Sequence, residues 1–311
     1  MDDLPVDQSQ RLPRDSLLGR RLAADKFVIT AELTPPVSTD PTEFIAKALP
    51  LKDLATAVNV TDGAGAKTHM SSVVAAHYLL QSGIEPILQM TCRDRNRIAL
   101  QADLIGAMSL GIRNLLVLSG DDPTAGDQPD AKPVFDLKSQ SLLETAHRIR
   151  MAHRLPTGTE IKGRIGLVLG GADMPVDPPP GWTPKGLIEK LNAGADFVQT
   201  QFCMDIDIVR RYAARLMELG IAQKIRILVG VAPIPSARSA RWMREKLYGT
   251  IIPDRMIERL EKAADPKREG TALCVDLVQQ LAEVSGIAGA HIMAPQNPSA
   301  IPEVIRASGL A

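Results

Sequence analysis

Short apolar, β-branched runs alternate with longer segments of helical spacing along most of the chain. The runs predict strands over residues 27–33, 57–60, 85–90, 114–118, 165–169, 197–200, 225–229 and 289–293. Helices are predicted over residues 41–51, 68–81, 96–110, 137–153, 183–193, 206–219, 237–246, 254–264, 267–284 and 300–307. Continuous apolar strands are typical of a parallel sheet that is buried on both faces. Their alternation with helices indicates βαβ crossovers.

Eight such strand–helix units favour an α/β fold of the (β/α)8 TIM-barrel type. The alternative, a doubly wound open sheet, usually has a glycine-rich phosphate loop after its first strand. Here Thr34, Pro35 and Pro36 follow that strand instead. We expect residues 1–25 to form an N-terminal extension whose helix covers the bottom of the barrel. Residues 26–311 are predicted to form a single catalytic barrel domain.

Composition narrows the classes of partner. The 36 Lys and Arg residues balance 36 Asp and Glu residues, and only 3% of the residues are aromatic. These values disfavour nucleic-acid binding and base stacking. The chain has neither a run of ~18 apolar residues nor an apolar secretory signal at its start. Its three widely spaced cysteines fit a reducing compartment. We therefore expect a cytoplasmic protein without a membrane partner, either a monomer or a homo-oligomer.

Active sites of such barrels lie where strands end and the following loops begin. Glu32 lies near the end of the first predicted strand among apolar neighbours. A carboxyl group in such surroundings is suited to general acid catalysis near neutral pH. The first four predicted strands contain no basic residue to pair with it. The competing interpretation is a structural carboxylate.

Other strand ends also carry polar side chains. Asp121 follows the fourth strand, so two carboxylates at the mouth could divide the roles of acid and anion. Asp121 could equally cap a turn, and the DGAGA segment at 62–66 could be an ordinary turn. Gln89 and Gln201 present amides that can bind the edge of a heteroaromatic ring. Cys92 has no adjacent base, which favours burial over reactivity.

The histidines predict neither a nucleophilic triad nor a metal site. His69, His77, His147 and His153 fall on predicted helices or their first turns. His291 lies inside the last predicted strand, where we interpret it as a core histidine with its hydrogen bonds satisfied.

Taken together, these segments resemble the methylenetetrahydrofolate reductase family over about residues 27–294. The matching segments are ELTPP at 32–36, VTDGA at 60–64, GIR at 111–113 with LSGDDP at 118–123, and AGAD at 193–196 with TQF at 200–202. Each is weak alone. Their order on successive strand ends makes the resemblance specific.

The resemblance implies a barrel that binds FAD and uses NADH or NADPH to reduce 5,10-methylenetetrahydrofolate to 5-methyltetrahydrofolate, in one-carbon metabolism and methionine biosynthesis. It implies that Glu32 is the general acid that protonates N10 of the folate. Asp121 and Gln201 would hold the pterin ring. The positions that would contact FAD are Thr61, Asp62, Ala64, Gln89, Ser119, Gly120, Asp121 and Lys190.

The chain departs from the family at several of these positions. The family commonly has His where this chain has Gln89 and Arg where it has Ser119, and its stacking aromatic after the seventh strand appears as Ala237. Two readings remain besides the flavoprotein: a flavin-free reductase that takes hydride directly from NADH, and a folate-binding barrel that serves methyl transfer without reduction. An unrelated aldolase-like barrel is disfavoured, because no Schiff-base lysine lies at a strand end.

Overall fold

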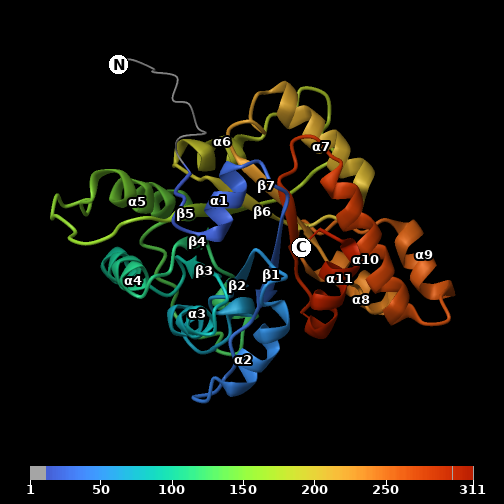
Figure 1. Cartoon of the computed structure of the whole chain (residues 1–311), viewed down its shortest axis with the longest axis horizontal. Helices are drawn as coiled ribbons and strands as arrows, with labels where there is room; N and C mark the ends of the chain where they lie inside the picture. The colour runs from blue at the N-terminus through green and yellow to red at the C-terminus, as the bar shows by residue number, and fades with distance from the viewer. Residues whose placement is uncertain (1–11, 296, 311) are drawn as a thin grey trace.

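A closed parallel barrel forms the centre of the chain. The computed structural model describes residues 12–295 and 297–310, and within them eight strands pair in chain order, with β8 returning to β1 (Figure 1). The strands are β1 (Val28–Leu33), β2 (Ala57–Val60), β3 (Pro86–Thr91), β4 (Asn114–Leu118), β5 (Val168–Asp173), β6 (Phe197–Phe202), β7 (Arg226–Val231) and β8 (Gly289–Ile292). The predicted (β/α)8 barrel is confirmed.

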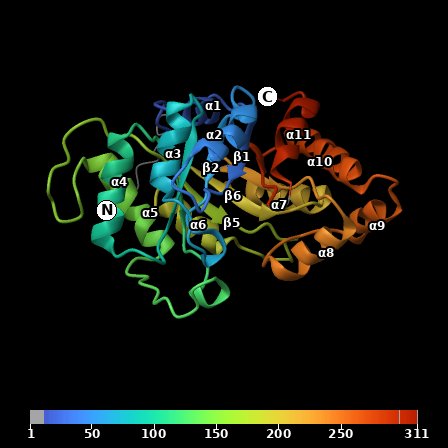
Figure 2. The ribbon, with the colours of Figure 1, turned by 90° about the horizontal axis from the view of Figure 1, so that it is seen from below.

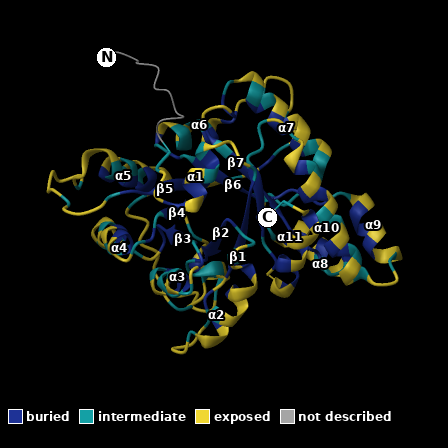
Figure 3. Cartoon of the chain, in the orientation of Figure 1, coloured by how far each residue is buried: buried dark blue, intermediate teal, exposed yellow. Residues whose placement is uncertain are grey.

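The helices surround the strands and turn their exposed residues outward (Figure 3). They are α1 (Leu17–Ala23), α2 (Thr42–Ala48), α3 (Ser72–Gln81), α4 (Arg97–Ser109), α5 (Ser139–Ala152), α6 (Lys185–Asn192), α7 (Ile206–Glu218), α8 (Ala237–Lys246), α9 (Asp254–Lys262), α10 (Pro266–Ala282) and α11 (Ile301–Ser308). Each predicted helix is present, with ends that differ by about four residues at most.

The fifth strand differs from its prediction. The apolar run at 165–169 predicted a strand that ends before the glycine pair, but β5 begins at Val168 and continues to Asp173. Gly170 and Gly171 pair with Phe197 and Val198 of β6. The ring of Phe197 occupies the space where a side chain at position 170 would lie. Gly171 faces the other side of the strand, where Lys190 and Leu143 lie against it. The glycine at position 170 thus makes room for an aromatic ring, and the strand continues through both glycines.

The bottom of the barrel is apolar and is covered by α1 (Figure 2). Leu18 and Leu22 of α1 pack against the first interior layer, which consists of Val28, Ala57, Ile87, Leu116, Val168, Phe197 and Leu228. Glu85 accepts hydrogen bonds from the backbone N–H groups of Leu17 and Leu18. The expected leading helix thus lies at the bottom of the barrel. Residues 1–11 of the expected extension lie outside the described residues, and a domain boundary at residue 25 stays a prediction.

A polar layer follows the apolar one inside the barrel. Side chains of a strand alternate between its two faces, so the residue two places after each bottom-layer residue faces inward again. Four of these positions hold Thr30, Asn59, Gln89 and Gln199, and β8 adds His291, two places after Gly289; all five are at most 5% exposed. Because β2 and β6 lie on opposite sides of the barrel, the hydrogen bond from Asn59 to Gln199 shows that this layer crosses the interior.

Candidate active site

Glu32 lies above the polar layer, two residues after Thr30 on β1, and its side chain is 24% exposed. Its Oε2 atom accepts a hydrogen bond of 2.7 Å from Nε2 of Gln89 on β3. The same oxygen lies 3.6 Å from Nε2 of His291 on β8. The structure therefore brings the expected acid together with Gln89 and with a histidine that sequence reasoning assigned to the core.

His291 is buried, as expected, and it also faces the candidate acid. The register of β8 on β1 aligns His291 with Thr30, whose Oγ1 lies 2.9 Å from Nδ1 of His291. The imidazole beside Glu32 thus comes from the strand that closes the barrel, whereas its amide partner Gln89 comes from β3. The signal that could have found it was the shared inward face of positions 30 and 291 in a closed barrel.

Gln199 and Asn59 form a buried amide pair beside Thr30 in the polar layer. Asn59 Nδ2 donates to Gln199 Oε1 at 2.6 Å, and Gln199 Nε2 donates back to Asn59 Oδ1 at 3.0 Å. Gln199 Nε2 also donates to Thr30 Oγ1 at 3.0 Å. Buried polar groups are costly unless they are paired, and this pairing satisfies the amides within the barrel.

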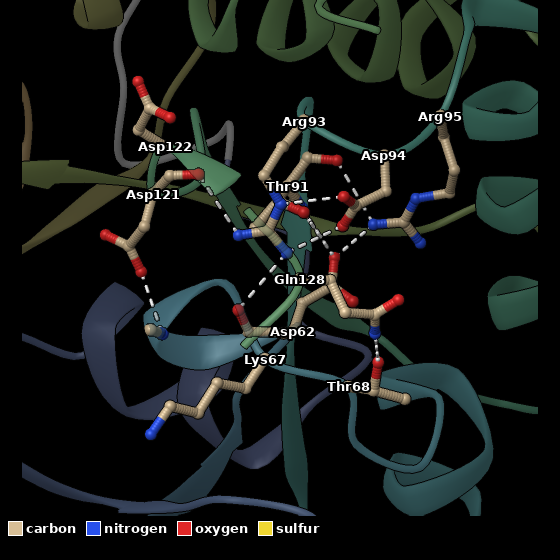
Figure 4. A network of polar contacts seen from close by, with 12 residues as sticks. Asp62, Lys67, Thr68, Thr91, Arg93, Asp94, Arg95, Asp121, Asp122 and Gln128 are labelled. Atoms are coloured by element: carbon tan, nitrogen blue, oxygen red, sulfur yellow. Dashed lines mark hydrogen bonds and ion pairs between the residues drawn. The ribbon is translucent and has the colours of Figure 1, made fainter. Parts of the chain in front are cut away.

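Two arginines join the loops that follow β2, β3 and β4 (Figure 4). Arg93, which is 4% exposed, donates to the backbone carbonyls of Gly63 and Asp121 and pairs with Asp94. Arg95 pairs with the carboxylate of Asp62. Sequence reasoning did not single out these arginines, although both lie within four residues of the end of β3.

Both carboxylate oxygens of Asp62 accept hydrogen bonds from neighbouring protein groups. Besides Arg95, its Oδ2 accepts hydrogen bonds from the backbone N–H and the hydroxyl of Thr91, at 2.8 and 3.0 Å. Its Oδ1 accepts one from Ser72 at 3.1 Å. Its assignment to a cofactor stays a prediction, and these bonds give it a structural role at the start of the loop.

Asp121 is exposed and points toward the loop after β2 (Figure 4). Its Oδ2 accepts a hydrogen bond of 2.9 Å from the backbone N–H of Gly65, next to Ala64. The turn-capping role that was weighed for Asp121 belongs to its neighbour Asp122, which accepts from the N–H of Thr124. A cavity shared by Asp121 and Glu32 stays a prediction.

Gln201 lies at the end of β6, beside an irregularity in the ladder. The pairing of β6 with β7 shifts register between Gln199 and Phe202. Gln201 Nε2 donates to the backbone carbonyl of Tyr248 at 3.2 Å, and its Oε1 accepts from the N–H of Phe202 at 3.0 Å. Pterin binding by Gln201 stays a prediction, and it requires these weak local bonds to be exchanged.

Lys190 lies on α6 beside β5. Its Nζ is 3.9 Å from Asp173 and donates to the carbonyl of Gly186 at 3.2 Å. Asp173 also accepts a hydrogen bond from the hydroxyl of Tyr212, and burial raises the pKa of the Asp173 carboxyl. Lys190 therefore has an anionic partner in the protein, and a role toward a cofactor phosphate stays a prediction.

Thr61 and Ser119 retain hydrogen-bonding capacity toward a ligand. Thr61 is 4% exposed, and its buried hydroxyl has no hydrogen-bond partner among the described residues. Ser119 is exposed, and its hydroxyl makes one long contact of 3.4 Å, to Ser139. Gly120 is held against Arg93 and Thr91, with a positive φ of 92°. Buried polar atoms without a hydrogen-bond partner are uncommon, and Thr61 is one of seven residues in the described part of the chain that have one.

Cys92, Cys203 and Cys274 are buried free thiols, in agreement with the interpretation of Cys92. Among residues 12–295 and 297–310, no group of three or more His, Cys, Asp or Glu side chains is arranged to hold a metal ion. Within the same ranges, none of the helices combines the length and apolar composition needed to cross a membrane.

Comparisons of the sequence with known proteins point to one family. Residues 17–309 match the family model described as methylenetetrahydrofolate reductase. A probable methylenetetrahydrofolate reductase (NADPH) of Caenorhabditis elegans is 27% identical over 252 residues, which cover 78% of this chain and 35% of that protein. Methylenetetrahydrofolate reductase 2 of Saccharomyces cerevisiae is 25% identical, over 74% of this chain and 37% of that protein.

The chain therefore spans little more than a third of the length of these two relatives. Among solved structures, an uncharacterized protein from Clostridium thermocellum that binds two copies of 5-methyl-5,6,7,8-tetrahydrofolic acid has the same fold, with a TM-score of 0.63 and 15% identity over 94% of this chain and 97% of that one. Because the family model covers nearly the whole chain, the chain belongs to the methylenetetrahydrofolate reductase family.

Proposed function

We propose that this protein reduces 5,10-methylenetetrahydrofolate to 5-methyltetrahydrofolate with hydride from NADH or NADPH, and that Glu32 is the general acid. The observation that carries the proposal is the setting of Glu32. Its carboxyl group lies at the mouth of the barrel, above a buried polar layer, with a firm hydrogen bond to one oxygen only. Family membership supports the substrate class and the pyridine nucleotide.

The chemistry assigned to Glu32 is one proton transfer. The O–H bond of its carboxyl group breaks and an N–H bond forms at N10 of the folate. The bond between N10 and the bridging carbon then opens, which leaves a cationic iminium at N5. Hydride adds to that carbon to give the N5-methyl group, and the nicotinamide is oxidised. A positioned acid of this kind contributes about 10²–10⁴-fold to the rate.

Asp121 and Gln201 are proposed to hold the pterin ring near Glu32. A carboxylate near the iminium stabilises the positive charge that develops there. In the free protein both side chains bond to backbone groups of neighbouring loops. Ligand binding would replace these exposed contacts, which are weaker than bonds within the buried layer.

FAD would pass hydride from the nicotinamide to the folate when bound. The unpartnered, buried hydroxyl of Thr61 fits a polar ligand at this place. We propose that Thr61, Ser119, Lys190 and the backbone at Ala64 and Gly120 hold the flavin nucleotide. The carboxylate of Asp62 stays with its protein partners in this arrangement.

One observation favours a second candidate, the flavin-free reductase. The resemblance assigns Gln89 and Asp62 to FAD, but both side chains are hydrogen-bonded within the protein. Gln89 donates to Glu32, and Asp62 accepts from Thr91 and Arg95. Absorbance of the purified protein separates the two candidates. A flavin spectrum, or its appearance on adding FAD, supports the flavoprotein. Oxidation of NADH by methylenetetrahydrofolate in a protein that stays colourless with FAD supports direct transfer.

The experiment that tests the proposal is Glu32→Gln, with Glu43→Gln on the exposed face of α2 as a matched control. We expect Glu32→Gln to slow reduction of methylenetetrahydrofolate by about 10²-fold or more, while 5-methyltetrahydrofolate still binds. The control should react as the wild type does. A wild-type protein that binds folate and turns over with neither nicotinamide would be a folate-binding barrel, and the reductase would be refuted.

A further inference from the structure

Contacts in the polar layer beneath Glu32 favour one tautomer of His291. Thr30 is fully buried, and its Oγ1 already accepts a hydrogen bond from Gln199 Nε2. Its own hydroxyl proton therefore needs an acceptor, and the atom in reach is Nδ1 of His291 at 2.9 Å. An Nδ1 that accepts carries no proton. The neutral ring then carries its proton on Nε2, the nitrogen that faces Glu32.

Two N–H donors consequently face one oxygen of Glu32 among the described residues. Gln89 Nε2 donates to Oε2 at 2.7 Å, and the Nε2–H of His291 lies 3.6 Å from the same atom. A protonated carboxyl group has one oxygen that accepts and one that donates. Donors at Oε2 make it the accepting oxygen, so the proton is left on Oε1.

We propose, on the basis of the function proposed above, that His291 is a positioning residue for Glu32: with Gln89 it holds Oε2, so that the proton leaves from Oε1. The separation of 3.6 Å is longer than a hydrogen bond, and catalytic hydrogen bonds often tighten only in the loaded complex. As Glu32 loses its proton, charge develops on the carboxylate and draws the His291 N–H toward Oε2. The contact is stronger after proton transfer than before it, which is the condition for accelerating the step.

The layer itself explains why the histidine is buried with so many amides. Asn59 and Gln199 hold each other reciprocally, Gln199 orients Thr30, and Thr30 sets the tautomer of His291. The titratable groups of this chain of contacts are Glu32 and His291. The other members are neutral, so they fix directions without supplying charge.

Three variants test the inference by kinetics. His291→Leu removes the donor, and we expect kcat to fall about tenfold, the lower end for losing a hydrogen bond to a charged group, while KM stays within about twofold because the ring does not bind folate. His291→Gln retains an amide N–H and should rescue kcat to within about threefold. The kcat of Thr30→Val should lie between those of His291→Leu and His291→Gln. Thr56→Val at the bottom of the barrel, another buried threonine, is the matched control and should keep the wild-type kcat.

A second measurement, by NMR, determines the tautomer of His291 and does not depend on enzyme activity. In ¹⁵N spectra of histidine-labelled protein, the signals lost in His291→Gln identify residue 291. We expect the wild type to show a protonated Nε2 and a bare Nδ1, and Thr30→Val to show a mixture. Thermal melting confirms that each variant is folded.

The outcomes separate the two proposals. A folded His291→Leu with unchanged kcat, equal rates for His291→Leu and His291→Gln, or a proton on Nδ1 in the wild type would overturn the role of His291. Those results leave Glu32 as the acid if Glu32→Gln is still inactive. A wild-type protein without reductase activity, or a fully active Glu32→Gln, refutes the proposed function itself, whatever the tautomer of His291.

Discussion

Glu85 attaches α1 to the bottom of the barrel, and its removal gives a measurable loss of stability. One carboxylate oxygen accepts from the N–H of Leu17 at 2.5 Å. The other accepts from the N–H of Leu18 at 2.8 Å and from the side chain of Asn114 at 3.0 Å. The first N–H groups of a helix have no partner within the helix, and an anion there is also favoured by the helix dipole.

Glu85→Gln replaces one accepting oxygen by an NH2 group, which faces a donor instead of satisfying it. Losing one hydrogen bond to a charged group costs about 1.5–3 kcal/mol. With about 2.1 cal/mol/K of unfolding entropy per residue, this cost lowers the melting temperature of a chain of this size by about 2–5 °C. Glu85→Ala should cost more, because both oxygens are lost.

Thermal unfolding followed by circular dichroism measures this effect, with Glu43→Gln as the exposed control. Reductase activity at 25 °C should be unchanged in Glu85→Gln, since Glu85 lies at the opposite end of the barrel from Glu32. An unchanged melting temperature would show that the carboxylate does not hold α1. Full activity loss without unfolding would refute the separation of the two ends.

Three further predictions follow from individual contacts. Burial raises the pKa of Cys92 to about 11 and of Cys203 to about 12, and also raises that of Cys274, so all three thiols stay protonated at pH 8 and should react with a thiol reagent only as the protein unfolds. Asp62→Asn should lower the melting temperature, because its partly buried partner Arg95 loses one of its two anions; equal melting curves would contradict this. Asp121→Asn should slow folate reduction about 10–100-fold, for the loss of a charge-assisted bond; an unchanged rate removes Asp121 from the site.

The fold could be predicted from the sequence because the strands are buried on both faces and are therefore read as apolar runs. The prediction failed locally at β5, where Gly170 and Gly171 looked like the end of a strand. A side chain at position 170 would collide with the ring of Phe197, which lies in the next strand of the barrel. A single strand's sequence does not contain that neighbour.

Glu32 could be predicted as a candidate acid from the sequence of β1. Its neighbours Gln89 and His291 could not, because they lie on other strands. Thr30 and His291 are 261 positions apart and meet only because the barrel closes. Once a closed barrel and a period of two are accepted, positions 30, 59, 89, 199 and 291 fall in one interior layer. Five polar residues at one depth of an otherwise apolar barrel are costly unless they act together, and this was the available signal for a network.

The glycines at the mouth show why cofactor contacts are harder to predict than the acid. Gly63 and Gly120 have positive φ values of 60° and 92°, and such residues permit close approach by another group. At both positions the group that approaches is the side chain of Arg93. A glycine in the sequence indicates that another group comes close to the backbone. It does not indicate whether that group is a ligand or a side chain of the protein, such as Arg93 here. The flavin contacts proposed at these loops therefore depend on Thr61, whose buried hydroxyl has no partner in the described part of the chain, more than on the glycines.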